Sequence, residues 1–137
     1  MKTLLVIFAH PDDESHGPGG TLAKYAAEGV KVHYLCATRG EAGRYFSDSA
    51  RRPDDGMVGR VRELELRNAA VVLGVRHVAF LDYMDGQLDR VDHDEAVGRI
   101  VAHIRHIRPD VVLTFDPYGA YGHPDHVAIC QLTTAAV

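Results

Sequence analysis

The sequence predicts an α/β domain in which a mostly parallel sheet carries helices on both faces. Two observations lead to this fold class. Four apolar runs of strand length, rich in valine, isoleucine and leucine, recur along the chain: 4–8, 32–37, 78–81 and 111–115. Amphipathic stretches of helical length lie between them: 21–28, 60–73 and 92–107. Strands that alternate with helices pair in parallel through right-handed crossovers, which bury the strands between two helical layers.

The first two strand and helix units have clear boundary residues. Thr21 is a suitable N-cap for the first helix, and Gly29 follows the end of that helix. The second strand is followed by a polar stretch, 38–59, that is too long to be a simple connector. This stretch could be an active-site flap or disordered surface, and because it leaves the carboxyl end of a strand, we expect the flap.

The remaining helices are identified by an apolar face and a terminating residue. Gly74 closes the helix 60–73, and Pro109 marks the end of the helix 92–107. A last helix is expected to begin near Asp125. Four strands and at least four helices follow from these signals.

Composition and charge narrow the classes of function. The 137 residues, 46% of them hydrophobic, fit a single domain. With 15 Lys plus Arg against 19 Asp plus Glu, the net charge of −4 provides no basic face for nucleic acid or an anionic membrane. Only five apolar residues, 4–8, lie near the amino terminus, too few for a signal peptide or a membrane span. Cys36 and Cys130 are too few for a disulfide scaffold, so we expect a cytoplasmic protein.

Ionisable residues gather in the segments that follow the strands. The run His10-Pro11-Asp12-Asp13-Glu14 follows the first strand, and Tyr121-Gly122-His123-Pro124-Asp125-His126 follows the fourth. Further polar residues follow the second and third strands, at 38–41 and 82–86. Ligands of a doubly wound sheet bind beyond the carboxyl ends of its strands. We therefore expect these segments to form one site.

The residue types in these segments suit metal-dependent hydrolysis. Two imidazoles and a carboxylate, drawn from His10, Asp13 and the later histidine pair, would form a three-ligand zinc site with one position open. Zinc lowers the pKa of water to about 7, so that a nucleophile forms at neutral pH. Asp12 is available as general base because it is not needed as a ligand, and Tyr121 can donate to a developing oxyanion.

These motifs, with the intervening Thr38-Arg39-Gly40-Glu41, resemble those of the zinc-dependent N-acetylglucosaminyl deacetylases, the LmbE-like family, over essentially the whole chain. The resemblance implies a Rossmann-like fold and removal of acetyl from an N-acetylglucosamine-containing small molecule or glycoconjugate. Members of that family usually continue well past the second motif. Residues 1–137 are therefore expected to form a single LmbE-like domain that is truncated at its carboxyl terminus.

The resemblance also implies roles for individual residues. It implies three zinc ligands, with Fe²⁺ as an alternative ion: His10, Asp13 and His126. It implies four residues that take part in the reaction: Asp12 as general base, His123 near the scissile amide, Asp125 tuning His123, and Tyr121 at the oxyanion. It implies two contacts to the sugar: Arg62 and Asp85.

Several alternatives stay open. The same metal centre could serve an amidase that removes a larger acyl group, or the chain could be a non-catalytic metal-binding domain. Its oligomeric state also stays open, and a homo-oligomer is possible. Arg62 could pair with a glutamate on its own helix, Asp85 could belong to a turn, and Glu14 could support a ligand or be solvated. Five further histidines are expected on solvated surfaces: His33, His77, His93, His103 and His106.

Overall fold

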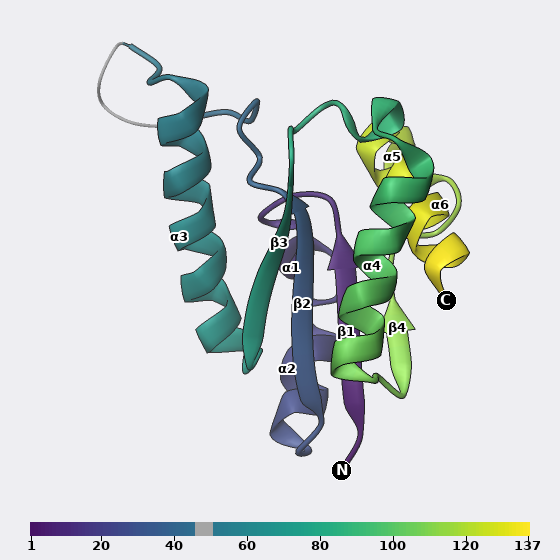
Figure 1. Cartoon of the computed structure of the whole chain (residues 1–137). Helices are drawn as coiled ribbons and strands as arrows, with labels where there is room; N and C mark the ends of the chain where they lie inside the picture. Colours follow the sequence, from purple (N-terminus) through teal and green to yellow (C-terminus); the bar gives the residue numbers. More distant parts are fainter. Residues whose placement is uncertain (46–50) are drawn as a thin grey trace.

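Strands and helices alternate along the chain in a computed structural model that describes residues 1–45 and 51–137 (Figure 1). The strands are β1 (Thr3–Phe8), β2 (Lys31–Thr38), β3 (His77–Tyr83) and β4 (Val111–Leu113). The helices are α1 (Asp13–His16), α2 (Gly19–Ala27), α3 (Asp55–Leu73), α4 (His93–Ile107), α5 (Gly119–Gly122) and α6 (Pro124–Ala136), with a 3₁₀ turn at Leu88–Arg90. The predicted fold class is confirmed.

The described strands form one parallel sheet in the order β3-β2-β1-β4. The first three strands are added towards one edge, and the chain then crosses to the other side of β1 to form β4. This is the strand order of the first part of a Rossmann fold, and the reversal between β1 and β4 is its topological switch point. The segments after β1 and β4 therefore flank a crevice at the carboxyl end of the sheet.

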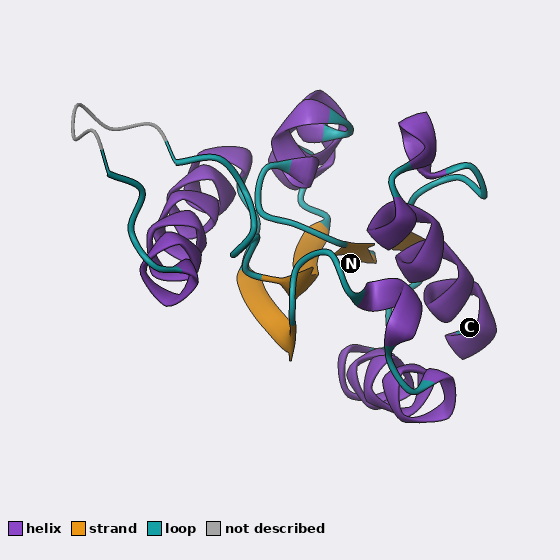
Figure 2. Ribbon diagram, turned by 90° about the horizontal axis from the view of Figure 1, so that it is seen from above, coloured by secondary structure: helices purple, strands orange, loops and turns teal. Residues whose placement is uncertain are grey.

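Alternating side chains of the strands build a core on each face of the sheet. Leu5 and Ile7 of β1 pack with residues of α4 and α6, whereas Leu4 and Val6 pack with residues of α2 and α3. Figure 2 shows helices on both sides of the strands. Because both faces are covered, the strands are apolar throughout rather than alternating with polar residues, as the sequence runs indicated.

Four predicted boundaries differ from the structure by two or more residues, one of them the end of β3, which was expected at 81 and lies at Tyr83. The helix expected at 60–73 begins at Asp55, because the Asp54 carboxylate accepts a hydrogen bond from the main-chain N–H of Met57 and caps it. The first long helix begins at Gly19, ahead of the expected cap Thr21. β4 ends at Leu113 because the next residue hydrogen-bonds through its side chain to the carbonyl of Ile7 instead of continuing the ladder.

The predicted flap is only partly described. Its residues 46–50 lie outside the described residues, and 55–59 belong to the first turns of α3. Residues 41–45 lie beside the carboxyl end of β2, where the flap was expected. Over the described part of the chain, no helix combines the length and apolar character needed to cross a bilayer.

Candidate active site

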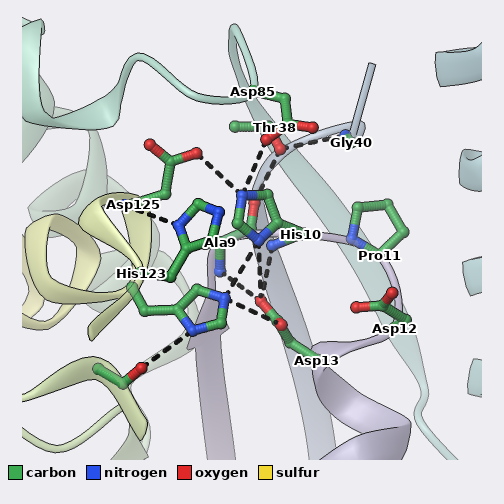
Figure 3. A network of polar contacts seen from close by, with 12 residues as sticks. Ala9, His10, Pro11, Asp12, Asp13, Thr38, Gly40, Asp85, His123 and Asp125 are labelled. Carbon is green, nitrogen blue, oxygen red and sulfur yellow. Dashed lines mark hydrogen bonds and ion pairs between the residues drawn. The ribbon is translucent and has the colours of Figure 1, made fainter. Parts of the chain in front are cut away.

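Two histidines from distant parts of the sequence meet at the switch point of the sheet. His10 lies two residues after the carboxyl end of β1, and His126 lies in the first turn of α6, after β4. Their ring centroids are 5.1 Å apart. Asp13, the first residue of α1, lies beside both rings, and Figure 3 shows its carboxylate next to the ring of His10. All three residues are buried.

The donor atoms of these residues have the spacing of a metal site. His10 Nδ1 lies 3.2 Å from His126 Nε2, and the Asp13 carboxylate oxygens lie 3.7 Å and 3.3 Å from those two nitrogens. Ligand atoms about 2.0–2.2 Å from a tetrahedral zinc ion are about 3.3 Å from one another. His10, Asp13 and His126 therefore form a candidate metal site with no rearrangement of the backbone.

Each ring has an inner nitrogen that faces the other ring, His10 Nδ1 and His126 Nε2, and an outer nitrogen that faces away. The hydrogen bonds of the outer nitrogens explain why the inner nitrogens can bind a cation. His10 Nε2 lies 2.9 Å from an Asp125 oxygen and 3.0 Å from an Asp85 oxygen, and His126 Nδ1 lies 3.2 Å from the carbonyl oxygen of Gly119. All of these partners are acceptors, so each outer nitrogen carries the proton. The neutral rings then direct two lone pairs and a carboxylate at the same point, which a cation satisfies.

A proton competes for the same position. Burial lowers the pKa of His10, but Asp125, Asp85 and Asp13 outweigh that effect and raise the pKa to about 9. A metal ion must displace this proton, so its binding should strengthen as the pH rises.

Neighbouring groups fix the orientation of the donor set. The Asp13 carboxylate accepts hydrogen bonds from the main-chain N–H groups of Ala9 and His10, at 3.2 and 2.8 Å. The ring of Phe115, just beyond β4, stacks on His126 with centroids 4.0 Å apart. Phe115 was expected to be the last residue of the fourth strand, and its contact with His126 could not be predicted from sequence spacing.

A second group of possible donors, His10, His123 and Asp125, shares this region. The Asp125 carboxylate, however, already accepts N–H groups from Gly86 and Leu88, at 2.7 and 3.0 Å, as well as contacting His10. Burial raises the pKa of Asp125, but His10 and the two amides outweigh it and lower the pKa. The carboxylate is thus satisfied as an anion and serves to orient His10.

The structure separates two contacts of Asp125. Its carboxylate contacts His10, whereas its main-chain N–H donates to Nδ1 of His123, at 3.1 Å. The expected influence on His123 therefore comes partly through the backbone. With Nδ1 accepting, the proton of neutral His123 is on Nε2. Burial and then the nearby His10 and His126 rings lower the pKa of His123.

Asp12 lies next to the donor set but makes different contacts (Figure 3). Its φ of 100° is in the left-handed region, which is strained for a residue other than glycine. Its carboxylate lies 3.0 Å from the Arg62 guanidinium. Burial raises the pKa of Asp12, although Arg62 opposes the shift. Glu14 is buried, not solvated, and accepts the main-chain N–H of Asp12, so it braces this strained turn.

Arg62 reaches the site from α3 rather than pairing with its neighbours in that helix. Its guanidinium donates to the carbonyls of Gly40 and Pro11 as well as to Asp12. A Cβ added at Gly40 would lie 2.0 Å from the guanidinium, and one at Gly43 would lie 2.3 Å away. Gly40 and Gly43 thus form a cradle for the Arg62 guanidinium. The sequence did not predict this cradle, and its only local signal was the glycine in Thr38-Arg39-Gly40-Glu41.

These residues surround one open pocket of about 1020 Å³. The sequence-predicted residues that line it come from four segments of the chain: His10, Asp12, Asp13, Arg62, Asp85, Tyr121 and His123. Tyr121 is largely exposed, with its ring 6.1 Å from that of His123. Burial and then Asp13 and Asp12 raise the pKa of Tyr121, so its phenol is a donor at neutral pH.

Fold and site together define a parallel α/β protein with a candidate metal centre at the switch point of its sheet. The chain belongs to the GlcNAc-PI de-N-acetylase family, whose profile matches residues 5–137. It is 41% identical to the 1D-myo-inositol 2-acetamido-2-deoxy-alpha-D-glucopyranoside deacetylase of Rhodococcus erythropolis, over 99% of this chain and 53% of that protein.

Solved structures give the same family relationship. The N,N'-diacetylchitobiose deacetylase of Pyrococcus horikoshii superposes with a TM-score of 0.86 at 31% identity, covering 98% of this chain and 49% of that one. GalB of Pseudomonas putida, a 4-carboxy-2-hydroxymuconate hydratase, has a TM-score of 0.84 at 30% identity, covering 99% and 55%. The chain thus spans about half the length of these relatives.

Proposed function

We propose that this chain carries the metal-binding and catalytic part of a zinc-dependent hydrolase that removes acetyl from an N-acetylglucosamine-containing small molecule. The observation that carries the proposal is the convergence of His10 Nδ1, His126 Nε2 and the Asp13 carboxylate beside a pocket that Asp12 also lines. His10, Asp13 and His126 would hold the ion. Two imidazoles and a carboxylate favour zinc, with Fe²⁺ as the alternative.

Asp12 is proposed as the general base. When bound, a zinc ion supplies Lewis acidity, which polarises a carbonyl group and makes water more acidic. Asp12 is half exposed to the pocket and is not part of the donor set, so its carboxylate is free to accept a proton from attacking water. Burial raises the pKa of this carboxylate, which makes it a stronger base.

His123 and Tyr121 are proposed to act on the other side of the scissile amide. Because Nδ1 of His123 accepts a backbone N–H, its Nε2–H can donate a hydrogen bond to the amide oxygen, and the proton that Asp12 takes from water can be passed on to the departing amine. The Tyr121 phenol lines the same pocket and can donate a second hydrogen bond to the developing oxyanion. Asp125 orients His10 and, through its N–H, His123.

Arg62 and Asp85 are proposed to contact the sugar, in addition to their contacts within the protein. Both line the pocket, Arg62 beside Asp12 and Asp85 beside His10. A pocket of about 1020 Å³ accommodates a sugar conjugate larger than N-acetylglucosamine itself.

Both cysteines are free and buried, which supports a reducing compartment such as the cytoplasm.

The test measures free amine and acetate released from N-acetylglucosaminyl-inositol and diacetylchitobiose. Metal-depleted protein should be inactive and should regain activity with Zn²⁺ or Fe²⁺. Asp12→Asn should keep the ion and lose about 10²–10⁴-fold in turnover, because a general base is removed. Asp94→Asn, which changes a fully exposed carboxylate, is the matched control and should leave turnover unchanged.

Other outcomes would assign a different function. Release of a longer acyl group in preference to acetate would identify an amidase of broader acyl specificity. Stoichiometric zinc binding with no hydrolysis of any acylated amino sugar would identify a metal-binding domain, and this result would contradict the proposed reaction.

A further inference from the structure

A second group of histidines lies at the opposite end of the sheet from the candidate active site. His33 is near the amino end of β2, and it faces His77, the first residue of β3, in register. His103 and His106 lie one turn apart near the carboxyl end of α4. All four line a cavity of about 540 Å³. They were expected on separate solvated surfaces, and only the sheet register and the packing of α4 bring them together.

The spacing of the two strand histidines is close to that of a shared metal ion. Their ring centroids are 6.4 Å apart. Two imidazole nitrogens about 2.0–2.1 Å from one ion place their ring centroids about 5–6 Å apart. In the candidate active site the His10 and His126 rings are 5.1 Å apart. His77 is exposed, so a side-chain rotation can close the remaining gap without moving the backbone.

His33 also has an unsatisfied nitrogen. Its Nδ1 is buried and has no hydrogen-bond partner among the described atoms. A buried donor or acceptor without a partner costs about 1–3 kcal/mol, so buried ring nitrogens usually have one. A ligand in the cavity would supply this partner once the ring turns towards it.

The neighbouring Arg76 and Lys31 are positively charged, and they favour the neutral imidazole that binds a metal cation over the imidazolium that binds an anion. Burial, followed by the neighbouring His77, Arg76, Lys31 and His106, lowers the pKa of His33. Burial and then His106 and His77 lower the pKa of His103. Both rings are therefore neutral at pH 7 and offer lone pairs, whereas an anion site would need them protonated.

The remaining groups at the cavity are few. The carboxyl end of α4, whose carbonyls carry partial negative charge, lies beside it. Lys31 and Thr3 line it as well, and the Lys31 ammonium sits on a flexible stem that can move into water. Among the described residues that line the cavity there is no carboxylate, so the imidazoles are the side chains there that can bind a transition metal ion.

We propose that His33 and His77, with one histidine of the α4 pair as a third ligand, bind a divalent transition cation such as Zn²⁺, Ni²⁺ or Cu²⁺. The donor atoms of these described histidines are not yet gathered within one ion's reach, so binding must turn the side chains into the cavity that they share. This site is separate from the candidate catalytic centre. An ion held there ties the carboxyl end of α4 to β2 and β3. It should therefore stabilise the fold without being needed for turnover.

The test titrates the metal-depleted chain with Zn²⁺, counts ions by calorimetry and follows the histidine rings by ¹H–¹⁵N NMR. The wild type should bind two ions, and the ring signals of His33, His77 and the α4 pair should shift with the second. His33→Gln/His77→Gln should bind one ion and keep its response at His10 and His126. If the double variant does not fold, the exposed His77→Gln change alone provides the same comparison.

His93→Gln is the matched control, because His93 is exposed on α4 but does not line the cavity. This variant should still bind two ions. Saturation of the wild type at one ion that shifts only His10 and His126 would overturn the proposal, as would two ions in the double variant or equal shifts at His93. One ion that shifts only the cavity histidines would support it and would count against the proposed catalytic centre instead. Shifts at the cavity histidines caused by phosphate but not by Zn²⁺ would also overturn it and identify an anion site. None of these outcomes depends on hydrolytic activity.

Discussion

The contacts between Gly40 and Arg62 allow us to predict how much the change Gly40→Ala lowers the free energy of unfolding. Gly40 has a φ of +67°, so alanine there costs about 1–2 kcal/mol of backbone strain. Its Cβ would lie 2.0 Å from Nη1 of Arg62, and the guanidinium, being at the end of a flexible side chain, must move away. Its hydrogen bonds to Gly40, Pro11 and Asp12 are then lost, at about 1–3 kcal/mol. Gly40→Ala should therefore lower the free energy of unfolding by about 2–5 kcal/mol.

Gly29→Ala separates the two contributions. Gly29 has a φ of +90°, and a Cβ there meets no described atom within 4 Å. This variant should therefore show the backbone strain alone, about 1–2 kcal/mol. Urea denaturation of both variants measures the difference. Proteolytically intact, folded protein at pH 7 is the starting state for each.

A double-mutant cycle then assigns the excess to Arg62. In an Arg62→Ala background, Gly40→Ala should cost no more than Gly29→Ala does in the wild type, because no guanidinium is left to displace. The reasoning is refuted if Gly40→Ala and Gly29→Ala differ by less than about 0.5 kcal/mol, or if the excess survives without Arg62.

Three further predictions concern stability. Leu35→Ala, in the core at 1% exposure, should lower the free energy of unfolding by about 2–5 kcal/mol in urea, whereas Val71→Ala, at 78% exposure, should change it by less than about 0.5 kcal/mol. Asp92→Ala removes the side-chain cap of α4 and should cost about 1 kcal/mol in thermal unfolding, more than Asp94→Ala in the same turn; equal effects would exclude the cap. Hydrogen bonds from Arg39 and Arg67 lower the pKa of Glu63 in the folded protein. The Glu63 carboxylate therefore stabilises the fold by about 1 kcal/mol above its pKa in the unfolded chain, and this contribution is lost as the pH falls through its pKa in the folded protein. The difference between wild type and Glu63→Gln should thus shrink from pH 7 to pH 3, and a difference independent of pH would contradict this.

The predicted helix boundaries show where local signals are insufficient. Asp54 was not identified as a helix cap, because Asp54, Asp55 and Gly56 in a polar stretch also suit a turn. The structure chooses the cap, because the Asp54 carboxylate accepts the main-chain N–H of Met57 whereas the Asp55 carboxylate accepts from Arg52.

Site residues differ in how far the sequence could place them. The two His-Pro-Asp motifs follow strands, and parallel strands end at one edge of a sheet, so their meeting was predictable. Arg62 and Phe115 could not be assigned in this way. Arg62 reaches Asp12 only because α3 packs beside the turn after β1, and Phe115 stacks on His126 only because β4 stops early.

By itself, the sequence determined where the strands and the longer helices lie and which polar residues follow the strands, because hydrophobic period and capping chemistry are local properties. The short helices α1 and α5 were not predicted. Only the tertiary structure decided which nitrogens of His10 and His126 face each other, since Asp125, the partner of His10, is 115 positions away in the sequence and Gly119, the partner of His126, belongs to the separate short helix α5. The same holds for His33 and His77. Their pairing depends on strand register, and register is set by the burial of whole faces rather than by either residue.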